Sequence, residues 1–112
     1  RHPGAAVSEA LDRLWATIVA RKGADPATSY TAKLLAAGVP KAAQKMGEEA
    51  VEAVVAAVGD VEKALVAESA DLLYHLLVLW AARGIDPGEV WDELARREGT
   101  SGLAEKAARK EK

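Results

Sequence analysis

Two stretches decide the fold: residues 48–58, EEAVEAVVAAV, and residues 68–80, ESADLLYHLLVLW. Both place apolar side chains three and four residues apart, the spacing that is typical of an α-helix. At about 100° per residue, the acidic side chains of each stretch share one side of their helix. These acidic residues are Glu48, Glu49 and Glu52 in the first stretch, and Glu68 and Asp71 in the second. Each cluster therefore points in one direction.

The two acidic clusters are expected to lie opposite one another, at the same height along a helical hairpin. A turn at Gly59-Asp60 joins the two helices into an antiparallel hairpin, and the clusters lie at similar distances before and after it. Like charges three or four residues apart cost a helix about 0.2–0.5 kcal/mol per pair, and more where apolar neighbours exclude water. A bound cation offsets that cost, and carboxylate oxygens favour hard ions such as Mg²⁺ or Mn²⁺. The sequence therefore predicts a divalent metal site. The alternative is a solvated acidic stripe on a helical interaction module.

The composition predicts a soluble all-α protein of one domain, residues 1–112. Half of the residues are apolar, phenylalanine is absent, and the formal net charge of −2 gives no basic surface for nucleic acid. The absence of cysteine excludes disulfides and zinc-thiolate sites and fits a cytoplasmic location. The apolar run from Leu72 to Ala82 is too short to span a bilayer. We expect residues 1–6 to be a disordered or tag-derived end, and residues 103–112 to be a basic tail.

Capping and breaking residues predict a bundle of about five helices. Ser8 and Ser29 are candidate N-caps, Pro40 suits a first turn, and Asp86-Pro87-Gly88-Glu89 has the pattern of a capping box. The expected helices are Ser8 to about Gly23, Ser29 to Gly38, Pro40 to about Val58, about Val61 to Arg83 with Asp60 as its cap, and Asp86 toward Arg97. The valines at 51, 54, 55 and 58 supply an apolar surface beside the acids, and we expect the carboxylates to border a core. The helix after Asp71 is expected to be buried on most sides, plausibly by a second subunit.

Four blocks of the sequence, in order, resemble the phosphoribosyl-ATP pyrophosphatase family. They are SYTAKL at 29–34, QKMGEEAVE at 44–52, ESADLLYHL at 68–76 and SGLAEK at 101–106. The resemblance implies the all-α nucleotide pyrophosphatase fold of the MazG type. It also implies hydrolysis of phosphoribosyl-ATP to phosphoribosyl-AMP and pyrophosphate, the second step of histidine biosynthesis, by a cytoplasmic, Mg²⁺-dependent homodimer. A separate phosphoribosyl-AMP cyclohydrolase is a candidate partner. The rival within the same fold is a house-cleaning nucleoside triphosphate pyrophosphatase.

The resemblance also implies roles for individual residues. The expected metal ligands are Glu49, Glu52, Glu68 and Asp71. The expected catalytic residues are Glu48 and Glu49, with Glu48 as a further ligand or as the base that aligns water. The expected phosphate contacts are Lys45, Lys33, Ser29, Thr31, Arg97, Ser101, Lys106 and Arg109. An ion pair with a neighbouring glutamate is the alternative for Lys45, and a solvated tail is the alternative for the C-terminal residues.

The sequence assigns structural roles to the remaining conspicuous side chains. We expect His75 to be packed or hydrogen-bonded, because it lies on an almost wholly apolar stretch. The tryptophans are expected to be core or interface anchors. There is no Gly-x-x-x-x-Gly-Lys loop and no arrangement typical of a covalent nucleophile.

Overall fold

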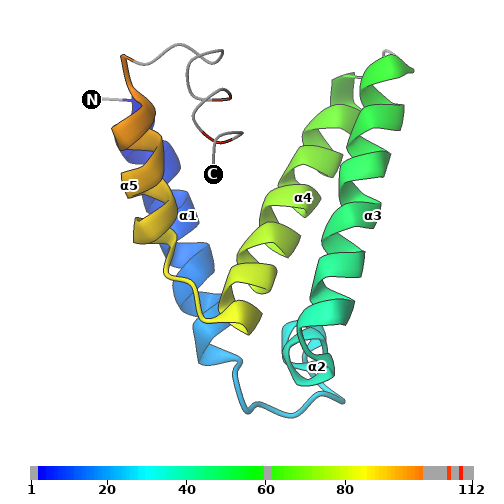
Figure 1. Ribbon diagram of the computed structural model, residues 1–112. Coiled ribbons are helices and arrows are strands. Elements are labelled where there is room, and N and C mark those ends of the chain that lie inside the picture. The colour runs from blue at the N-terminus through cyan, green and yellow to red at the C-terminus, as the bar shows by residue number, and fades with distance from the viewer. Residues whose placement is uncertain (1–2, 60–61, 100–105, 107–108, 110–112) are drawn as a thin grey trace.

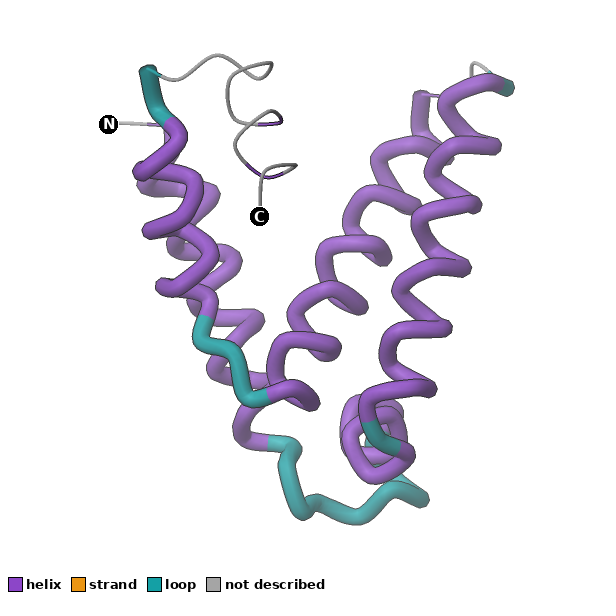
Figure 2. The backbone as a smooth tube through the Cα atoms, viewed as in Figure 1, coloured by secondary structure: helices purple, strands orange, loops and turns teal. Residues whose placement is uncertain are grey.

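The computed structural model describes residues 3–59, 62–99, 106 and 109. The described residues form five α-helices and no strand, which confirms the expected all-α fold (Figure 1). The helices are α1 (Pro3–Ala20), α2 (Tyr30–Ala37), α3 (Val39–Val58), α4 (Glu62–Arg83) and α5 (Pro87–Arg97). Figure 2 shows that the longest described connection is the loop between α1 and α2.

The boundaries of α2 and α3 follow from the predicted signals. The Ser29 side chain accepts a hydrogen bond from the Ala32 backbone N–H at 3.1 Å and caps α2. Gly38 has a φ of +95°, a conformation that side chains with a Cβ rarely adopt, and it separates α2 from α3. Pro40 lies in the first turn of α3, and Gly59 ends that helix. The predicted Asp60 cap and Val61 lie outside the described residues.

The fifth helix begins with the predicted capping box. The Asp86 side chain accepts from the Gly88 backbone N–H at 2.8 Å, and the Glu89 side chain accepts from the Asp86 backbone N–H at 3.0 Å. Pro87 occupies the first turn, where its missing N–H would have no helical partner. The three local signals agree, so α5 begins where the sequence predicts.

The start of α1 differs from the prediction. The helix begins at Pro3, so Ser8 is an interior residue and not a cap. A proline suits the first position of a helix because its φ is already fixed near the helical value. The sequence thus contained a second start signal upstream of Ser8. At the other end, α1 stops at Ala20, and Gly23 follows with a φ of +79°.

Helix α4 lies at the centre of the molecule. It packs antiparallel against α3 along its length and also contacts α1 and α2. Figure 1 shows α3 on one side of α4, and α1 and α5 on the other. The buried core comprises Ile18, Leu34, Ala42, Leu77, Val78 and Ala81. Trp80 contacts Trp91 edge to face, with ring centroids 5.8 Å apart, which joins α4 to α5.

The apolar surface that the sequence predicts beside the acidic residues is present, and it is uncovered in a single chain. Four valines of α3 are between 61% and 81% exposed: Val51, Val54, Val55 and Val58. On α4, Val66 is 66% exposed and Leu73 is 48% exposed. We call the four valines of α3 the valine face. The other side of α3 packs against α4, so the described part of one chain leaves the valine face uncovered.

Among the described residues, α4 is the one helix that is long and apolar enough to cross a membrane by length and composition. It carries Glu68 and Asp71 near its middle and supplies four buried residues to the molecule, His75, Leu77, Val78 and Ala81. A central helix of a helical bundle has the same composition.

Candidate metal and catalytic site

The hairpin of α3 and α4 brings acidic side chains from both helices together. One carboxylate oxygen each of Glu49, Glu68 and Asp71 lies within 4.8 Å of the others. Glu49 belongs to α3, and the other two residues are one turn apart on α4. The helical period and the antiparallel packing therefore produce the convergence that the sequence predicts, since both clusters lie at similar distances from the turn.

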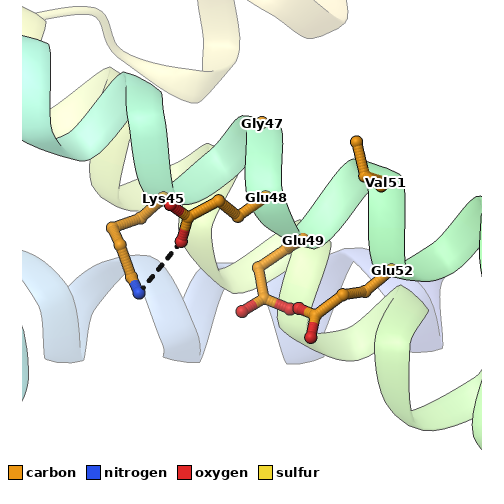
Figure 3. Close-up of a pocket in the computed structure, with 6 residues that line it drawn as sticks. All are labelled: Lys45, Gly47, Glu48, Glu49, Val51 and Glu52. Carbon is orange, nitrogen blue, oxygen red and sulfur yellow. Dashed lines mark ion pairs between the residues drawn. The ribbon is translucent and has the colours of Figure 1, made fainter.

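Glu52 extends this cluster through Glu49. Figure 3 shows the two carboxyl groups next to one another on α3. A hydrogen bond with Glu52 raises the pKa of Glu49 to about 7, and partial burial and the nearby charges of Glu52 and Asp71 act in the same direction. Two carboxyl groups this close share a proton more easily than they both ionise. Glu49 therefore keeps its proton well above the pH at which an ordinary glutamate ionises.

The donor set fits a hard cation. The Glu68 Oε2 atom is buried and has no hydrogen-bond partner among the described residues, although buried carboxylate oxygens are almost always bonded. Glu49, Glu68 and Asp71 offer only oxygen ligands, the type that Mg²⁺ and Mn²⁺ prefer. A cation between the two helices would give the Glu68 oxygen a partner and offset the repulsion among the carboxylates.

Glu48 does not join the cluster of three. Its side chain accepts a hydrogen bond from Gln44 at 2.9 Å and pairs with the Lys45 ammonium at 3.2 Å. Both contacts lower the pKa of Glu48, and the hydrogen bond from Gln44 has the larger effect. Glu48 is therefore ionised at pH values at which Glu49 is still protonated. The Glu48 contact likewise raises the pKa of Lys45. The ion pair considered as the alternative for Lys45 is thus present.

Open pockets border the acidic cluster on both of its sides along α3. The larger pocket has a volume of about 620 Å³, and its lining residues are Lys45, Gly47, Glu48, Glu49, Val51 and Glu52 (Figure 3). A second pocket of about 310 Å³ is lined by Glu52, Val55, Ala56, Ala64 and Glu68. A ligand can therefore reach the carboxylates from solvent, and Lys45 and Glu48 stand at one edge of its path.

The predicted phosphate contacts on α2 have structural partners or face solvent. The Ser29 hydroxyl caps the helix, and the Thr31 hydroxyl contacts the Tyr74 hydroxyl. Lys33 is exposed. Of these three residues, Lys33 is therefore the one whose functional group faces solvent.

Of the predicted contacts near the C-terminus, Arg97 pairs within its own helix, α5. The Arg97 guanidinium donates to Glu93 at 2.9 Å. Arg96 and then Arg97 lower the pKa of Glu93 to about 2. Lys106 and Arg109 are exposed and have helical backbone. Ser101 lies outside the described residues.

An aromatic cluster beside the acids was not predicted as part of the site. His75 is 6% exposed, which confirms the expectation of a packed histidine, and its Nδ1 lies 2.9 Å from the Asp71 carbonyl oxygen. Its Nε2 lies 3.4 Å from the Tyr30 hydroxyl. The four-residue spacing of Asp71 and His75 was the available signal, because residues so spaced lie on one helix face.

Comparison with known proteins gives one consistent family. Residues 11–98 match the family described as phosphoribosyl-ATP pyrophosphohydrolase. The chain is 66% identical over 89% of its length to the phosphoribosyl-ATP pyrophosphatase of Azospirillum brasilense, covering 90% of that protein. It is 64% identical over 96% of its length to the enzyme of the same name from Parvibaculum lavamentivorans, covering 99% of it. The namesake from Granulibacter bethesdensis is 57% identical over 90% of the chain, which spans 63% of that longer protein.

These matches confirm the resemblance seen in the four sequence blocks, and the name of the family states a hydrolase activity on phosphoribosyl-ATP. The five helices are the all-α architecture expected of it. The chain belongs to the phosphoribosyl-ATP pyrophosphohydrolase family.

Proposed function

We propose that this protein hydrolyses phosphoribosyl-ATP to phosphoribosyl-AMP and pyrophosphate, a step of histidine biosynthesis. One observation carries the proposal: a chain of this family holds three carboxylates within 4.8 Å of one another between α3 and α4, beside an open pocket. Such a site suits attack of water on a phosphoric anhydride, where negative charge builds on the leaving group.

Glu49, Glu52, Glu68 and Asp71 are the proposed ligands of a Mg²⁺ ion, with Mn²⁺ as a substitute. When bound, Mg²⁺ supplies charge neutralisation for the leaving pyrophosphate. The carboxylates would hold the ion from two helices that already pack together, so its binding would require little reorganisation. Glu49 must release its proton to act as a ligand, because its pKa in the metal-free site is about 7.

Glu48 and Glu49 have different proposed roles at the pocket. The Glu48 carboxylate is occupied by Lys45 and Gln44, so we assign it to holding the Lys45 ammonium at the pocket edge. Lys45 can there contact a substrate phosphate as a point charge. Glu49 is the proposed base that accepts a proton from the attacking water, because its carboxylate has a second oxygen beyond the one that faces the cluster.

Contacts to the rest of the substrate are proposed from the two flanking segments. Lys33 on α2 is exposed and can reach a phosphate, with Ser29 and Thr31 in the same short helix region. The C-terminal candidates are Arg97, Ser101, Lys106 and Arg109. Their side chains provide the cationic and hydroxyl donors that a phosphoribosyl phosphate requires.

The active protein is proposed to be a cytoplasmic homodimer, with the valine face as the contact between the two copies. Four exposed valines spaced three and four residues apart form one apolar side of α3, a contiguous patch of the kind that marks an interaction site. The valines lie next to the acids on α3, so a second copy would also narrow the approach to the pocket. Association with a separate phosphoribosyl-AMP cyclohydrolase, the enzyme that uses the product, is part of the same proposal.

The direct test is release of pyrophosphate from phosphoribosyl-ATP in the presence of Mg²⁺. Wild-type protein should release it, and Glu68→Gln should lower kcat by at least about a hundredfold, because the variant loses a ligand between the helices. Glu62→Gln is the matched control, since Glu62 is an exposed acid in the first turn of the same helix. Faster hydrolysis of ordinary nucleoside triphosphates than of phosphoribosyl-ATP would instead favour a house-cleaning enzyme.

A further inference from the structure

A directional chain of hydrogen bonds leads from α2 to the acidic turn of α4. His75 Nδ1 lies 2.9 Å from the Asp71 carbonyl oxygen, and a carbonyl oxygen can only accept, so Nδ1 carries the hydrogen. A neutral imidazole protonated at Nδ1 presents a lone pair at Nε2. The Tyr30 hydroxyl, 3.4 Å from Nε2, is then the donor. The chain runs from Tyr30 through His75 to the main chain of Asp71.

Two tyrosine rings fix the orientation of the imidazole. The Tyr74 ring meets His75 edge to face at a centroid distance of 4.9 Å and an interplanar angle of 87°. The Tyr30 ring meets it at 6.1 Å and 74°. His75 is also buried, so rotation of its ring would require both tyrosines to move. The hydrogen-bond directions are therefore set by packing as well as by the partners themselves.

A second tie between α2 and α4 lies one residue away and provides an internal comparison. The hydroxyls of Thr31 and Tyr74 are hydrogen-bonded to one another, again linking α2 to α4. That bond ends at side chains and does not reach the backbone of Asp71. The Tyr30–His75 chain does reach the backbone of Asp71. Both hydrogen-bonded links therefore join α2 to α4, but only the Tyr30–His75 link connects to the acidic cluster.

Among the three clustered carboxylates, the orientation of Asp71 is the least constrained by packing. Glu49 and Glu68 are partly buried, whereas Asp71 is exposed. Packing therefore contributes less to the direction of its carboxylate, and a short side chain follows the position of its own backbone closely. A contact that holds the Asp71 carbonyl also holds the turn from which the carboxylate projects.

We propose that Tyr30 and His75 are positioning residues for the acidic site, because they tie the α4 turn that carries Asp71 to the first turn of α2. The inference rests on the proposed function in that Asp71 must act as a metal ligand. Neither residue touches the metal in this arrangement. Their contribution is to preorganise the carboxylates before a cation arrives, as outer partners of metal ligands do elsewhere.

Metal affinity is the readout that separates positioning from general stability. We would titrate Mn²⁺ and Mg²⁺ into the wild type, Tyr30→Phe and Tyr74→Phe, and follow binding by calorimetry. Tyr30→Phe keeps the ring and removes the hydroxyl that bonds His75, and it should weaken metal binding by about tenfold, the low end of effects for outer partners. Tyr74→Phe removes the neighbouring tie and should stay within about twofold of the wild type.

A third variant tests whether Tyr30 acts through His75. His75→Phe removes both hydrogen bonds and should weaken metal binding at least as much as Tyr30→Phe does. Adding Tyr30→Phe to His75→Phe should then have no further effect, since residues that act in one chain are not additive. All variants should have their unfolding measured with a chelator present, so that affinities are compared for folded protein.

The outcomes separate this inference from the proposed function. Equal metal affinity of Tyr30→Phe and Tyr74→Phe, or additive effects of Tyr30→Phe and His75→Phe, would overturn the inference. A wild type that binds no divalent metal would overturn it as well. A wild type that binds metal but releases no pyrophosphate would reject the proposed function, and the affinities of the variants would still decide the positioning role.

Discussion

The protonation of Glu49 gives the metal-free protein a specific pH dependence. The folded group has a pKa of about 7 against an ordinary value of 4.5, so the folded state binds the proton more tightly than the unfolded state. The stability from this group is complete below about pH 4.5 and is lost as the pH rises to about 7. With a chelator present, urea unfolding should show this decline in the wild type and a smaller one in Glu49→Gln.

The same measurement with Mg²⁺ gives the complementary result. A cation favours the ionised form of Glu49, so saturating Mg²⁺ should reduce the decline between pH 4.5 and 7 or reverse it. An identical pH profile for the wild type and Glu49→Gln under chelation would contradict the assignment of this pKa to Glu49.

The buried oxygen of Glu68 predicts opposite effects of one substitution with and without metal. Its Oε2 atom has no hydrogen-bond partner in the part of the chain that the structure describes, and unsatisfied buried groups cost about 1–3 kcal/mol. Glu68→Gln removes a charge there, so in chelator it should unfold at equal or higher urea concentration than the wild type. Mg²⁺ should raise the melting temperature of the wild type and not that of Glu68→Gln. A metal-induced rise in both proteins would show that the ion binds elsewhere.

The convergence of Glu49, Glu68 and Asp71 could be predicted at the level of single residues because helical period and hairpin register are simple geometry. The divergence of Glu48 could not. Glu48 lies one residue from Glu49, and its carboxylate could contact either the acidic cluster or its neighbours Gln44 and Lys45. Which of these contacts forms depends on the side-chain rotamer and on nearby charges, and the spacing of acidic residues in the sequence does not predict either.

Among the helices, α5 depends on its N-terminal cap. Asp86 accepts from the Gly88 N–H, and Asp86→Ala should lower the free energy of unfolding by about 1 kcal/mol, the usual effect of losing a cap. Asp92→Ala removes the same side chain from an exposed interior position of the helix and should be neutral or slightly stabilising. Urea denaturation of both variants measures the difference, and equal destabilisation would argue against the capping role.

Most helix boundaries were predictable because the chain marks them chemically. Ser29, Gly38, Pro40 and Asp86 each impose or satisfy a particular backbone conformation at a helix end. The start of α1 was missed because Ser8 is a good cap by residue type, although Pro3 offered an earlier start. Local signals identify candidate ends, and the packing of the whole helix decides which one is used.

At the scale of the whole molecule, the valine face predicts the oligomeric state. Val54→Glu places a charge on that face at a side chain that is 61% exposed in one chain, and burial of an unpaired charge against a second copy is strongly unfavourable. Light scattering after size exclusion should give the mass of a dimer for the wild type and of a monomer for Val54→Glu. Val19→Glu, an exposed valine on α1, is the control and should remain dimeric.

The sequence could not distinguish a core from an interface between chains. Both need an apolar stripe on a helix, and the period of α3 and the apolar length of α4 are the same in either case. The prediction of a buried α4 was therefore only partly correct: His75, Leu77, Val78 and Ala81 are inside the chain, whereas Leu73 is half exposed. To decide whether an apolar helix face belongs to the core or to an interface, one must know which elements of the same chain pack against it.

The contact between Trp80 and Trp91 gives the protein a built-in optical probe. The two indoles meet at 5.8 Å where α5 joins the central helix, while the carboxylate cluster lies further toward the other end of α4. Separation of α5 would expose an indole to water and shift its emission to longer wavelength. Because Trp15 is the third tryptophan, a Trp15→Phe variant would let intrinsic fluorescence follow opening of this junction in unlabelled protein, independently of chemistry at the acidic end.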